Sequence, residues 1–223
     1  HFENTGTVFS IKLGAIIKPV ESLRIGLAFH SPTIYKIDEY YYDNINSRFD
    51  GNDTYELKNQ PSRYNYALTT PFRALGGVAY QIKKSGLISA DIEYIDYSTV
   101  RFSETGDDYD YSEKNLAIQN TLKQTVNLRF GGEYRLNKIY FRGGYALYGK
   151  AFEKGEDNEN MDHQSFSFGL GFREQNLYVD LGYVNLSNTQ NYILYNTFTE
   201  SPAALLNTRR NIFSVTFGYR FGY

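Results

Sequence analysis

The sequence predicts an all-β fold, an antiparallel transmembrane β-barrel to which these 223 residues contribute about nine strands. Three observations support this fold class. Apolar and polar residues alternate with a strict period of two in segment after segment. The polar faces of these segments carry charges of both signs, which suits a hydrated barrel interior. Short turns also alternate with long polar loops along the chain.

The alternation is clearest in residues 213–223. Successive side chains of a strand point to opposite faces, so a strand of this kind can place one face in lipid. One face here is large and apolar or aromatic, and the other is small or polar. The first face comprises Phe213, Val215, Phe217, Tyr219, Phe221 and Tyr223, and the second comprises Ser214, Thr216, Gly218, Arg220 and Gly222.

The same alternation recurs upstream and predicts the other strands. In each segment one face is free of charged residues, whereas the opposite face holds Gly, Ser and charged residues. Leu75 is an exception, because it interrupts the polar face of its segment. These strands are expected at residues 9–17, 23–30, 72–81, 88–94, 126–135, 139–147, 165–173 and 177–183.

The connections between the segments alternate in length, and this asymmetry orients the predicted barrel. Outer-membrane barrels have short periplasmic turns and long extracellular loops. A brief helix at residues 113–121 fits within one of the loops. We expect turns at 19–22, 83–86, 137–138 and 175–176, and loops at 38–62, 102–120, 151–163 and 187–208.

The bulk composition excludes several classes of protein but hides the membrane signal. Mean hydropathy is -0.50, which is typical of a soluble protein, yet only alternate residues of a barrel strand face lipid. No apolar run approaches the roughly 18 residues of a transmembrane helix. The absence of Cys excludes disulfides and thiolate metal sites. A net charge of -2 argues against a nucleic-acid partner.

A soluble β-sandwich is the main alternative fold, because its strands also alternate. A sandwich has no reason to alternate tight turns with long loops. Its strands also have no reason to keep one face uncharged while the other face carries both signs of charge. These differences favour the barrel.

The odd number of strands has a consequence for closure of the barrel. The last strand is expected to end at the periplasmic rim, and counting back places His1 near the extracellular rim. Single-chain bacterial barrels have even numbers of strands. We therefore expect residues 1–223 to form one partial barrel domain, completed by an N-terminal remainder in a separate fragment or outside these residues.

Five segments carry local patterns that recur in one family of barrels. They are LRIGLAFHSP at 23–32, TPFR with GVAY within 70–80, DIEYIDYS at 91–98, NLRFGGEYR at 127–135 and FRGGY at 141–145. These segments resemble, in order, strands of the FadL-type family of outer-membrane transporters for hydrophobic compounds. The resemblance implies a barrel of about fourteen strands with an N-terminal hatch in its lumen, the hatch and first strands being absent from this chain.

The resemblance also implies a function, namely passive uptake of hydrophobic compounds such as long-chain fatty acids across the outer membrane of a Gram-negative bacterium. Two alternatives remain open: a barrel subunit or scaffold of a larger outer-membrane complex, and a general porin. The expected partners are outer-membrane lipid and lipopolysaccharide, a hydrophobic small-molecule ligand, the remainder of the barrel and, for a scaffold, other outer-membrane proteins. No nucleic acid and no cofactor are expected.

The predicted lumen-facing residues are candidates for ligand binding or for ion pairs within the wall. Arg makes two-point contacts with carboxylates, so an Arg here either holds a fatty-acid carboxylate or pairs with a neighbouring acid. The ion-pair interpretation is favoured for any single Arg. The set comprises Arg24, His30, Arg73, Asp91, Glu93, Arg129, Glu133, Arg135, Arg142, Asp180 and Arg220.

Two groups of aromatic residues are further candidates. Tyrosines of the loops either capture apolar cargo at the extracellular mouth or belong to an aromatic girdle. Alternating aromatics at the C-terminus resemble the signal for the outer-membrane assembly machinery, and they also fit a lipid-facing lower girdle. The loop group comprises Tyr40, Tyr41, Tyr42, Tyr109, Tyr111, Tyr192 and Tyr195, and the C-terminal group comprises Phe217, Tyr219, Phe221 and Tyr223.

No catalytic or metal site is predicted, and we do not expect an enzyme. His30 and Ser31 are adjacent in a strand, so their side chains diverge and do not form a nucleophile with its base. The acidic stretches 107–110 and 156–159 bind Ca²⁺, join cation bridges with lipopolysaccharide, or form solvated loops. Neither matches the EF-hand pattern, and the solvated loop is favoured.

Overall fold

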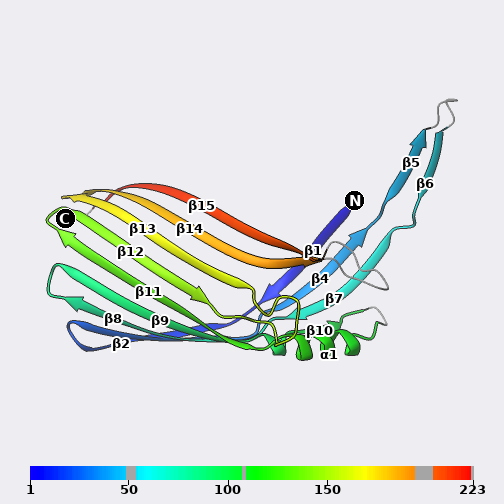
Figure 1. The fold of residues 1–223 in the computed structure, drawn as a ribbon, viewed down its shortest axis with the longest axis horizontal. Helices are drawn as coiled ribbons and strands as arrows, with labels where there is room; N and C mark the ends of the chain where they lie inside the picture. Colours follow the sequence, from blue (N-terminus) through cyan, green and yellow to red (C-terminus); the bar gives the residue numbers. More distant parts are fainter. Residues whose placement is uncertain (49–53, 107–108, 194–202, 222–223) are drawn as a thin grey trace.

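A computed structural model describes residues 1–48, 54–106, 109–193 and 203–221. Most of these residues lie in antiparallel strands (Figure 1), which confirms the all-β fold class. Within the described ranges the largest sheet has nine strands, the number expected, in the order β15-β14-β13-β12-β11-β9-β8-β3-β2. We call it the wall sheet. Its strands are β2 Lys12–Val20, β3 Leu23–His30, β8 Arg73–Ile82, β9 Gly86–Asp96, β11 Gln124–Leu136, β12 Ile139–Tyr148, β13 Asp162–Glu174, β14 Leu177–Ile193 and β15 Ala203–Tyr219.

Tight hairpins join the wall strands at one end, which we call the turn end. They connect β2 with β3, β8 with β9, β11 with β12 and β13 with β14, and all four lie where the sequence predicted turns. Lys83, Asn137 and Gln175 have positive φ angles of 51°, 54° and 46°. Asn137 and Gln175 open two-residue connections and Lys83 opens a three-residue one. Short hairpin connections of this kind need a residue with positive φ, which Asn adopts more readily than Lys or Gln.

Four of the wall strands continue beyond the opposite end, the loop end, into a second sheet that we call the extension sheet. Its strand order is β1-β4-β7-β10. A two-stranded hairpin of β5 and β6 projects from it between β4 and β7 (Figure 1). The strands are β1 Phe2–Phe9, β4 Ile34–Tyr41, β5 Asn44–Arg48, β6 Thr54–Lys58, β7 Ser62–Thr69 and β10 Arg101–Glu104.

A row of backbone interruptions separates the wall sheet from the extension sheet. Pro32 and Pro71 stand in this row and lack the N–H that a ladder needs. Hydroxyl side chains replace part of the ladder: Ser31 Oγ accepts from the Ile11 N–H at 2.9 Å, and Thr70 Oγ1 accepts from the Thr33 N–H at 3.1 Å. The extension sheet consequently bends away from the line of the wall strands (Figure 1).

The loop end is more ordered than the sequence suggested. The expected loop 187–208 was too long, because β14 runs to Ile193 and β15 begins at Ala203. The polar residues that suggested a loop instead pair across the two strands, as when Thr189 Oγ1 donates to Asn207 Oδ1 at 2.8 Å. The expected loop 38–62 likewise contains β5 and β6. The brief helix predicted at 113–121 is confirmed as α1, Ser112–Thr121.

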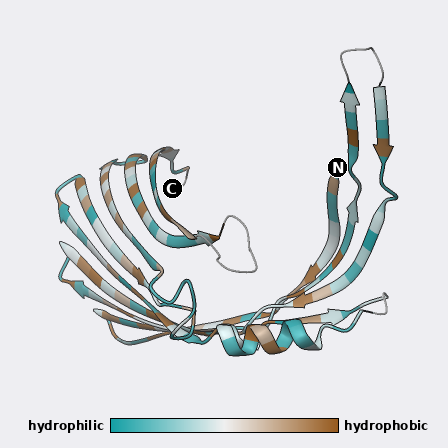
Figure 2. Ribbon diagram, turned by 45° about the vertical axis from the view of Figure 1, so that its right-hand side comes forward, coloured by the Kyte–Doolittle hydropathy of each residue, from teal (hydrophilic) through white to brown (hydrophobic). Residues whose placement is uncertain are grey.

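The wall sheet has an apolar outer face and little conventional core. Among the described residues the buried apolar side chains are only Ala67, Ile95 and Ala146. Large apolar side chains instead alternate outward, and Phe213 and Phe217 are 78% and 75% exposed. Figure 2 shows this alternation as hydrophobic and hydrophilic bands along the strands of one curved sheet. A single layer with an exposed apolar face is the wall of a transmembrane barrel and not a two-layer sandwich.

Within the described residues, β2 and β15 form the two outer edges of the wall sheet. Figure 2 shows an open curve between them. The described helices include none that is long and apolar enough to cross a membrane.

Candidate functional site

A cluster of aromatic rings lies on the extension sheet, beyond the wall sheet. The ring centroids of Tyr66 and Phe102 are 5.9 Å apart, and those of Phe102 and Tyr111 are 5.8 Å apart with planes only 18° from parallel. Tyr109 lies 4.7 Å from Tyr111. Rings at these separations attract one another and present flat apolar faces.

These rings line a cavity of about 280 Å³, which we call the aromatic pocket. A neighbouring cavity of about 380 Å³ shares three of its aromatic residues. Flat apolar walls with a few polar groups are typical of sites for small apolar ligands. The aromatic pocket is lined by Glu39, Tyr64, Tyr66, Phe102, Tyr109, Tyr111 and Lys114.

Local interactions fix the position of the residues around the pocket. β10 is an edge strand that pairs with β7 on one side. On its other side, Asn115 of α1 takes the place of a strand, because its Nδ2 donates to the Phe102 carbonyl and its Oδ1 accepts from the Phe102 N–H, both at 2.8 Å. Asp110 accepts from Ser112 Oγ at 2.5 Å and from Ser112 N–H at 2.9 Å, and these bonds lower the pKa of Asp110.

One acid and one base contribute charge to the pocket. The Tyr66 hydroxyl donates to Glu39 Oε2 at 3.1 Å. Burial, together with the nearby Glu39 carboxylate, raises the pKa of Tyr66, so its hydroxyl stays neutral and donates. The Lys114 ammonium lies 4.9 Å from the ring centroid of Tyr109 and 5.9 Å from that of Tyr111, where ring faces attract a cation.

The structure brings together two of the seven tyrosines proposed for capture, Tyr109 and Tyr111. Tyr40 and Tyr42 lie 5.8 Å apart and instead contact the ring of His1, Tyr40 edge-on and Tyr42 at a tilt. Tyr41 and Tyr192 are exposed strand residues that do not line the pocket. Tyr195 lies outside the described residues.

Several residues of the pocket were not predicted from the sequence. Tyr64, Tyr66 and Phe102 come from strands that we did not expect. Glu39 was expected in a loop and Lys114 in the brief helix within a loop, and neither was a candidate site residue. A signal was present, because Tyr64, Tyr66 and Leu68 alternate with a period of two between two prolines.

The face of the wall sheet opposite its apolar outer face, which we call the inner face, carries a cluster of polar side chains around a buried acid. Glu93 is only 3% exposed. Arg129 Nη2 donates to it at 2.5 Å, Asn127 Nδ2 at 3.1 Å and Arg73 Nη1 at 3.4 Å. Asn127 Oδ1 in turn accepts from the Gly149 N–H at 2.9 Å. The buried carboxylate therefore has several donors from β8 and β11.

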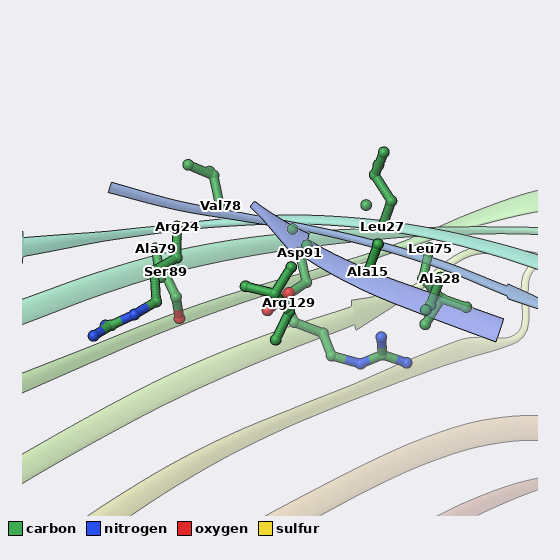
Figure 3. A pocket seen from close by; sticks show the side chains of 15 residues that line it. Ala15, Arg24, Leu27, Ala28, Leu75, Val78, Ala79, Ser89, Asp91 and Arg129 are labelled. Carbon is green, nitrogen blue, oxygen red and sulfur yellow. The ribbon is translucent and has the colours of Figure 1, made fainter. Parts of the chain in front are cut away.

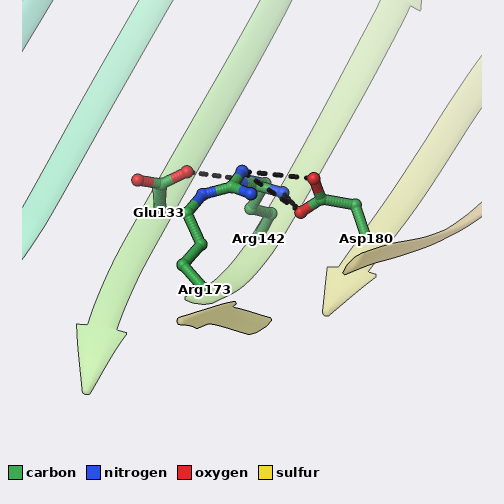
Figure 4. Close-up of polar contacts among 4 residues, drawn as sticks. All are labelled: Glu133, Arg142, Arg173 and Asp180. Carbon is green, nitrogen blue, oxygen red and sulfur yellow. Dashed lines mark hydrogen bonds and ion pairs between the residues drawn. The ribbon is translucent and has the colours of Figure 1, made fainter. Parts of the chain in front are cut away.

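A second cluster of charges lies on the same face, nearer the turn end (Figure 4). Arg142 bridges two acids, because its Nε donates to Glu133 at 2.6 Å and its Nη1 donates to Asp180 at 2.7 Å. Arg173 also donates to Asp180, at 3.2 Å. Arg173 was not among the predicted candidates, although the alternation of β13 places it on the inner face.

Arg24, Asp91 and Arg129 line a cavity of about 670 Å³ in the wall sheet. Glycine and alanine residues of β2, β3 and β8 make up much of its lining. Figure 3 shows Leu27 and Val78 on one side of these strands, with Arg24 and Arg129 on the other side. The cavity therefore includes surface from both faces of the wall.

The other predicted lumen-facing residues lie apart from this cavity. His30 is the last residue of β3. Arg135 lies at the turn end, where its Nε donates to the Asn137 carbonyl at 3.0 Å. Arg220 follows β15, and its backbone N–H donates to the Asn176 carbonyl at 2.7 Å. The structure thus distributes the predicted residues over two clusters and several separate positions.

The C-terminal aromatics lie on the outer face of β15 and just beyond it. Phe217, Tyr219 and Phe221 are exposed, and the rings of Tyr219 and Phe221 are 4.8 Å apart. Tyr223 lies outside the described residues. The acidic residues Asp107 and Asp108 lie outside them too. Among the residues described, no group of acids and histidines is arranged to hold a metal ion.

Comparison with known proteins identifies the family. The family model described as "Outer membrane protein transport protein (OMPP1/FadL/TodX)" matches residues 1–221. No curated protein sequence matches the chain. The solved structure of the Ralstonia pickettii toluene transporter TbuX is similar in fold, with a TM-score of 0.53 and 16% sequence identity. The match covers 95% of this chain and 47% of TbuX, so the chain spans about half the length of that protein. The chain belongs to the OMPP1/FadL/TodX family of outer-membrane transport proteins.

Proposed function

We propose that this chain forms part of the wall of an outer-membrane transporter for the passive uptake of hydrophobic compounds, and that the aromatic pocket is where cargo is first captured. Membership of the family supports a transport function. The near-parallel rings of Phe102 and Tyr111 carry the assignment of the pocket, because a flat apolar molecule gains most against such surfaces. No covalent chemistry is part of this function.

The size and the lining side chains of the pocket favour a small aromatic cargo over a long-chain fatty acid. A cavity of about 280 Å³ is just below the usual range for small-molecule sites, so it suits a small compound better than a long chain. Glu39 places a negative charge on one wall, which disfavours a carboxylate. TbuX, which has a similar fold, is a toluene transporter. A fatty acid is the alternative cargo, with its carboxylate near Lys114 and its chain against the rings.

We further propose that the wall sheet closes into a barrel with strands outside these residues, and that a hatch fills the lumen. The free edges of β2 and β15 support closure, because exposed edges that lie in a membrane cannot satisfy their backbone polar groups. The hatch is proposed from the resemblance to the FadL-type family alone. Amide hydrogen exchange on the complete protein tests it. Closure predicts exchange in β2 and β15 as slow as in β12, and fast exchange confined to those two strands would refute it.

Uptake by living cells tests the assignment of the pocket. Cells of a Gram-negative strain that lacks its own transporter would express the complete protein, and the initial uptake of labelled toluene and of labelled dodecanoate would be measured. Phe102→Ala and Tyr111→Ala should each slow toluene uptake roughly tenfold at low concentration, since each removes one face of the pocket.

The matched control is Tyr192→Ala, which removes an exposed tyrosine that does not line the pocket. Unchanged toluene uptake in both pocket variants would refute the assignment of the pocket. A loss confined to dodecanoate would identify the fatty acid as the cargo instead.

A further inference from the structure

Three guanidinium groups surround one tyrosine ring at the turn end of the wall. The ring centroid of Tyr140 lies 5.3 Å from Cζ of Arg135, 5.7 Å from that of Arg142 and 5.0 Å from that of Arg173. Arg173 also lies 5.0 Å from the ring of Tyr178. Strands β11, β12, β13 and β14 thus contribute side chains to one compact cluster on the inner face, which we call the arginine cluster.

The register of the strands explains why these side chains meet. Arg135 is directly opposite Tyr140 across the β11–β12 hairpin, and Arg173 is directly opposite Tyr178 across the β13–β14 hairpin. Residues directly opposite one another in an antiparallel pair project to the same face. The two hairpins are neighbours in the sheet because β12 pairs with β13, and in this pairing Tyr140 is opposite Gly171.

Two glycines leave room for the cluster. A Cβ on Gly171 would lie 2.5 Å from Asp180 Oδ1, and a Cβ on Gly218 would overlap the ring of Tyr178. The Asp180 carboxylate and the Tyr178 ring therefore lie over bare backbone. Larger residues at either position would displace the side chains that hold Arg142 and Arg173.

The cations of the cluster outnumber its acids. Asp180 pairs with both Arg142 and Arg173, and Glu133 pairs with Arg142. Arg135 has no carboxylate partner among the described residues, and its side-chain bond there goes to the Asn137 carbonyl through Nε. The two terminal nitrogens of Arg135 are therefore left as donors. Three guanidiniums against two carboxylates leave one positive charge unbalanced.

The inner face of the wall strands as a whole also has an excess of positive charge. Its cationic side chains outnumber its acidic ones, whereas the chain has a net charge of -2. The negative charge of the protein is therefore concentrated elsewhere. Among the described residues of the wall strands, the cationic residues of the inner face include Lys12, Arg24, Arg73, Arg129, Arg135, Arg142 and Arg173, and the acidic ones are Asp91, Glu93, Glu133 and Asp180.

We propose that Arg135, Arg142 and Arg173 form an anion-binding site on the inner face at the turn end, which takes the carboxylate or phosphate group of a molecule inside the barrel. Guanidinium donors match the paired oxygens of these groups. The rings of Tyr140 and Tyr178 offer apolar surface to the rest of such a molecule. The site goes beyond the proposed function, because it does not depend on which compound the aromatic pocket captures.

Calorimetric titration of the complete protein in a non-ionic detergent tests this site. The probes are octanoate, inorganic phosphate and uncharged octanol. Arg135→Gln is the informative variant, because it removes the surplus charge and leaves no carboxylate without its partner. We expect octanoate affinity to fall roughly tenfold in Arg135→Gln, and to fall with added salt in the wild type.

The matched control is Arg24→Gln, which removes another inner-face guanidinium, one on β3. Octanoate affinity should change less than about twofold in this variant and octanol binding should not change in either. Competition by phosphate would identify any free oxyanion as the ligand, whereas octanoate binding without such competition would identify an amphiphile. Equal losses in Arg24→Gln and Arg135→Gln, or no loss in Arg135→Gln, would overturn the proposal.

Discussion

Asn115 forms a two-point clamp on Phe102, in which one side-chain amide satisfies both the N–H and the carbonyl of an edge-strand residue. The clamp attaches α1 to β10 and so positions one wall of the aromatic pocket. An edge strand otherwise presents unpaired backbone groups. The ordering of the pocket therefore depends on a residue that does not line it.

Replacement of the clamp should loosen the pocket. Asn115→Ala leaves two backbone groups of Phe102 without partners, at a local cost of about 1–3 kcal/mol. We expect the Phe102 amide to exchange with solvent roughly ten- to hundredfold faster, as measured by hydrogen exchange with mass spectrometry. Asn120→Ala in the exposed part of α1 is the control, and equal exchange in the two variants would contradict the role of the clamp.

The hydroxyl of Tyr66 should titrate abnormally. Its pKa is raised in the folded state, first by burial and then by Glu39. Because the pKa of Tyr66 is raised on folding, its protonated hydroxyl contributes to stability below the pKa of the unfolded tyrosine, near 10. This contribution to stability is lost as the pH rises through the pKa of Tyr66 in the folded protein. The difference in tyrosinate absorbance between wild type and Tyr66→Phe isolates this group. Glu39→Gln should shift the Tyr66 transition to lower pH, and an unshifted transition would contradict the contact.

The buried acid of the wall should be sensitive to loss of charge. Glu93→Gln weakens the bonds from Arg129 and Arg73 and should lower the free energy of unfolding in detergent by about 1–3 kcal/mol. Asp91→Asn is a close control, because Asp91 lies on the same strand and face but is exposed. It should change stability by less than about 0.5 kcal/mol. Equal effects would show that the Glu93 cluster contributes nothing specific.

A methyl group beside Asp180 should disturb the arginine cluster. Gly171→Ala places a Cβ 2.5 Å from Asp180 Oδ1 and should destabilise the protein by about 1–3 kcal/mol. Gly143→Ala on β12 is the matched control, since a Cβ there meets nothing within 4 Å. Urea unfolding of the protein in detergent measures both variants, and Gly143→Ala should be neutral or slightly stabilising. A neutral Gly171→Ala would show that Asp180 moves aside without cost.

The sequence predicted the wall far better than the pocket, for a physical reason. Alternation reports which face of a strand meets lipid, and tight turns report which strands are neighbours, so the nine wall strands and their hairpins followed from pattern alone. The polarity of Asn207 and Thr189 suggested a loop, because sequence polarity does not distinguish solvent from a cross-strand partner. The contact of Asn115 with Phe102 joins two elements through a loop, and no local period encodes such a contact.

The most direct test of the central claim is a structure of the complete protein with 4-bromotoluene, in which the anomalous signal of bromine locates the ligand. We predict a bromine peak in the aromatic pocket, with the ligand ring about 4–6 Å from the rings of Phe102 and Tyr111. This peak should be lost in Phe102→Ala. A ligand found only elsewhere in the protein, or a pocket peak that persists unchanged in Phe102→Ala, would contradict capture at this site.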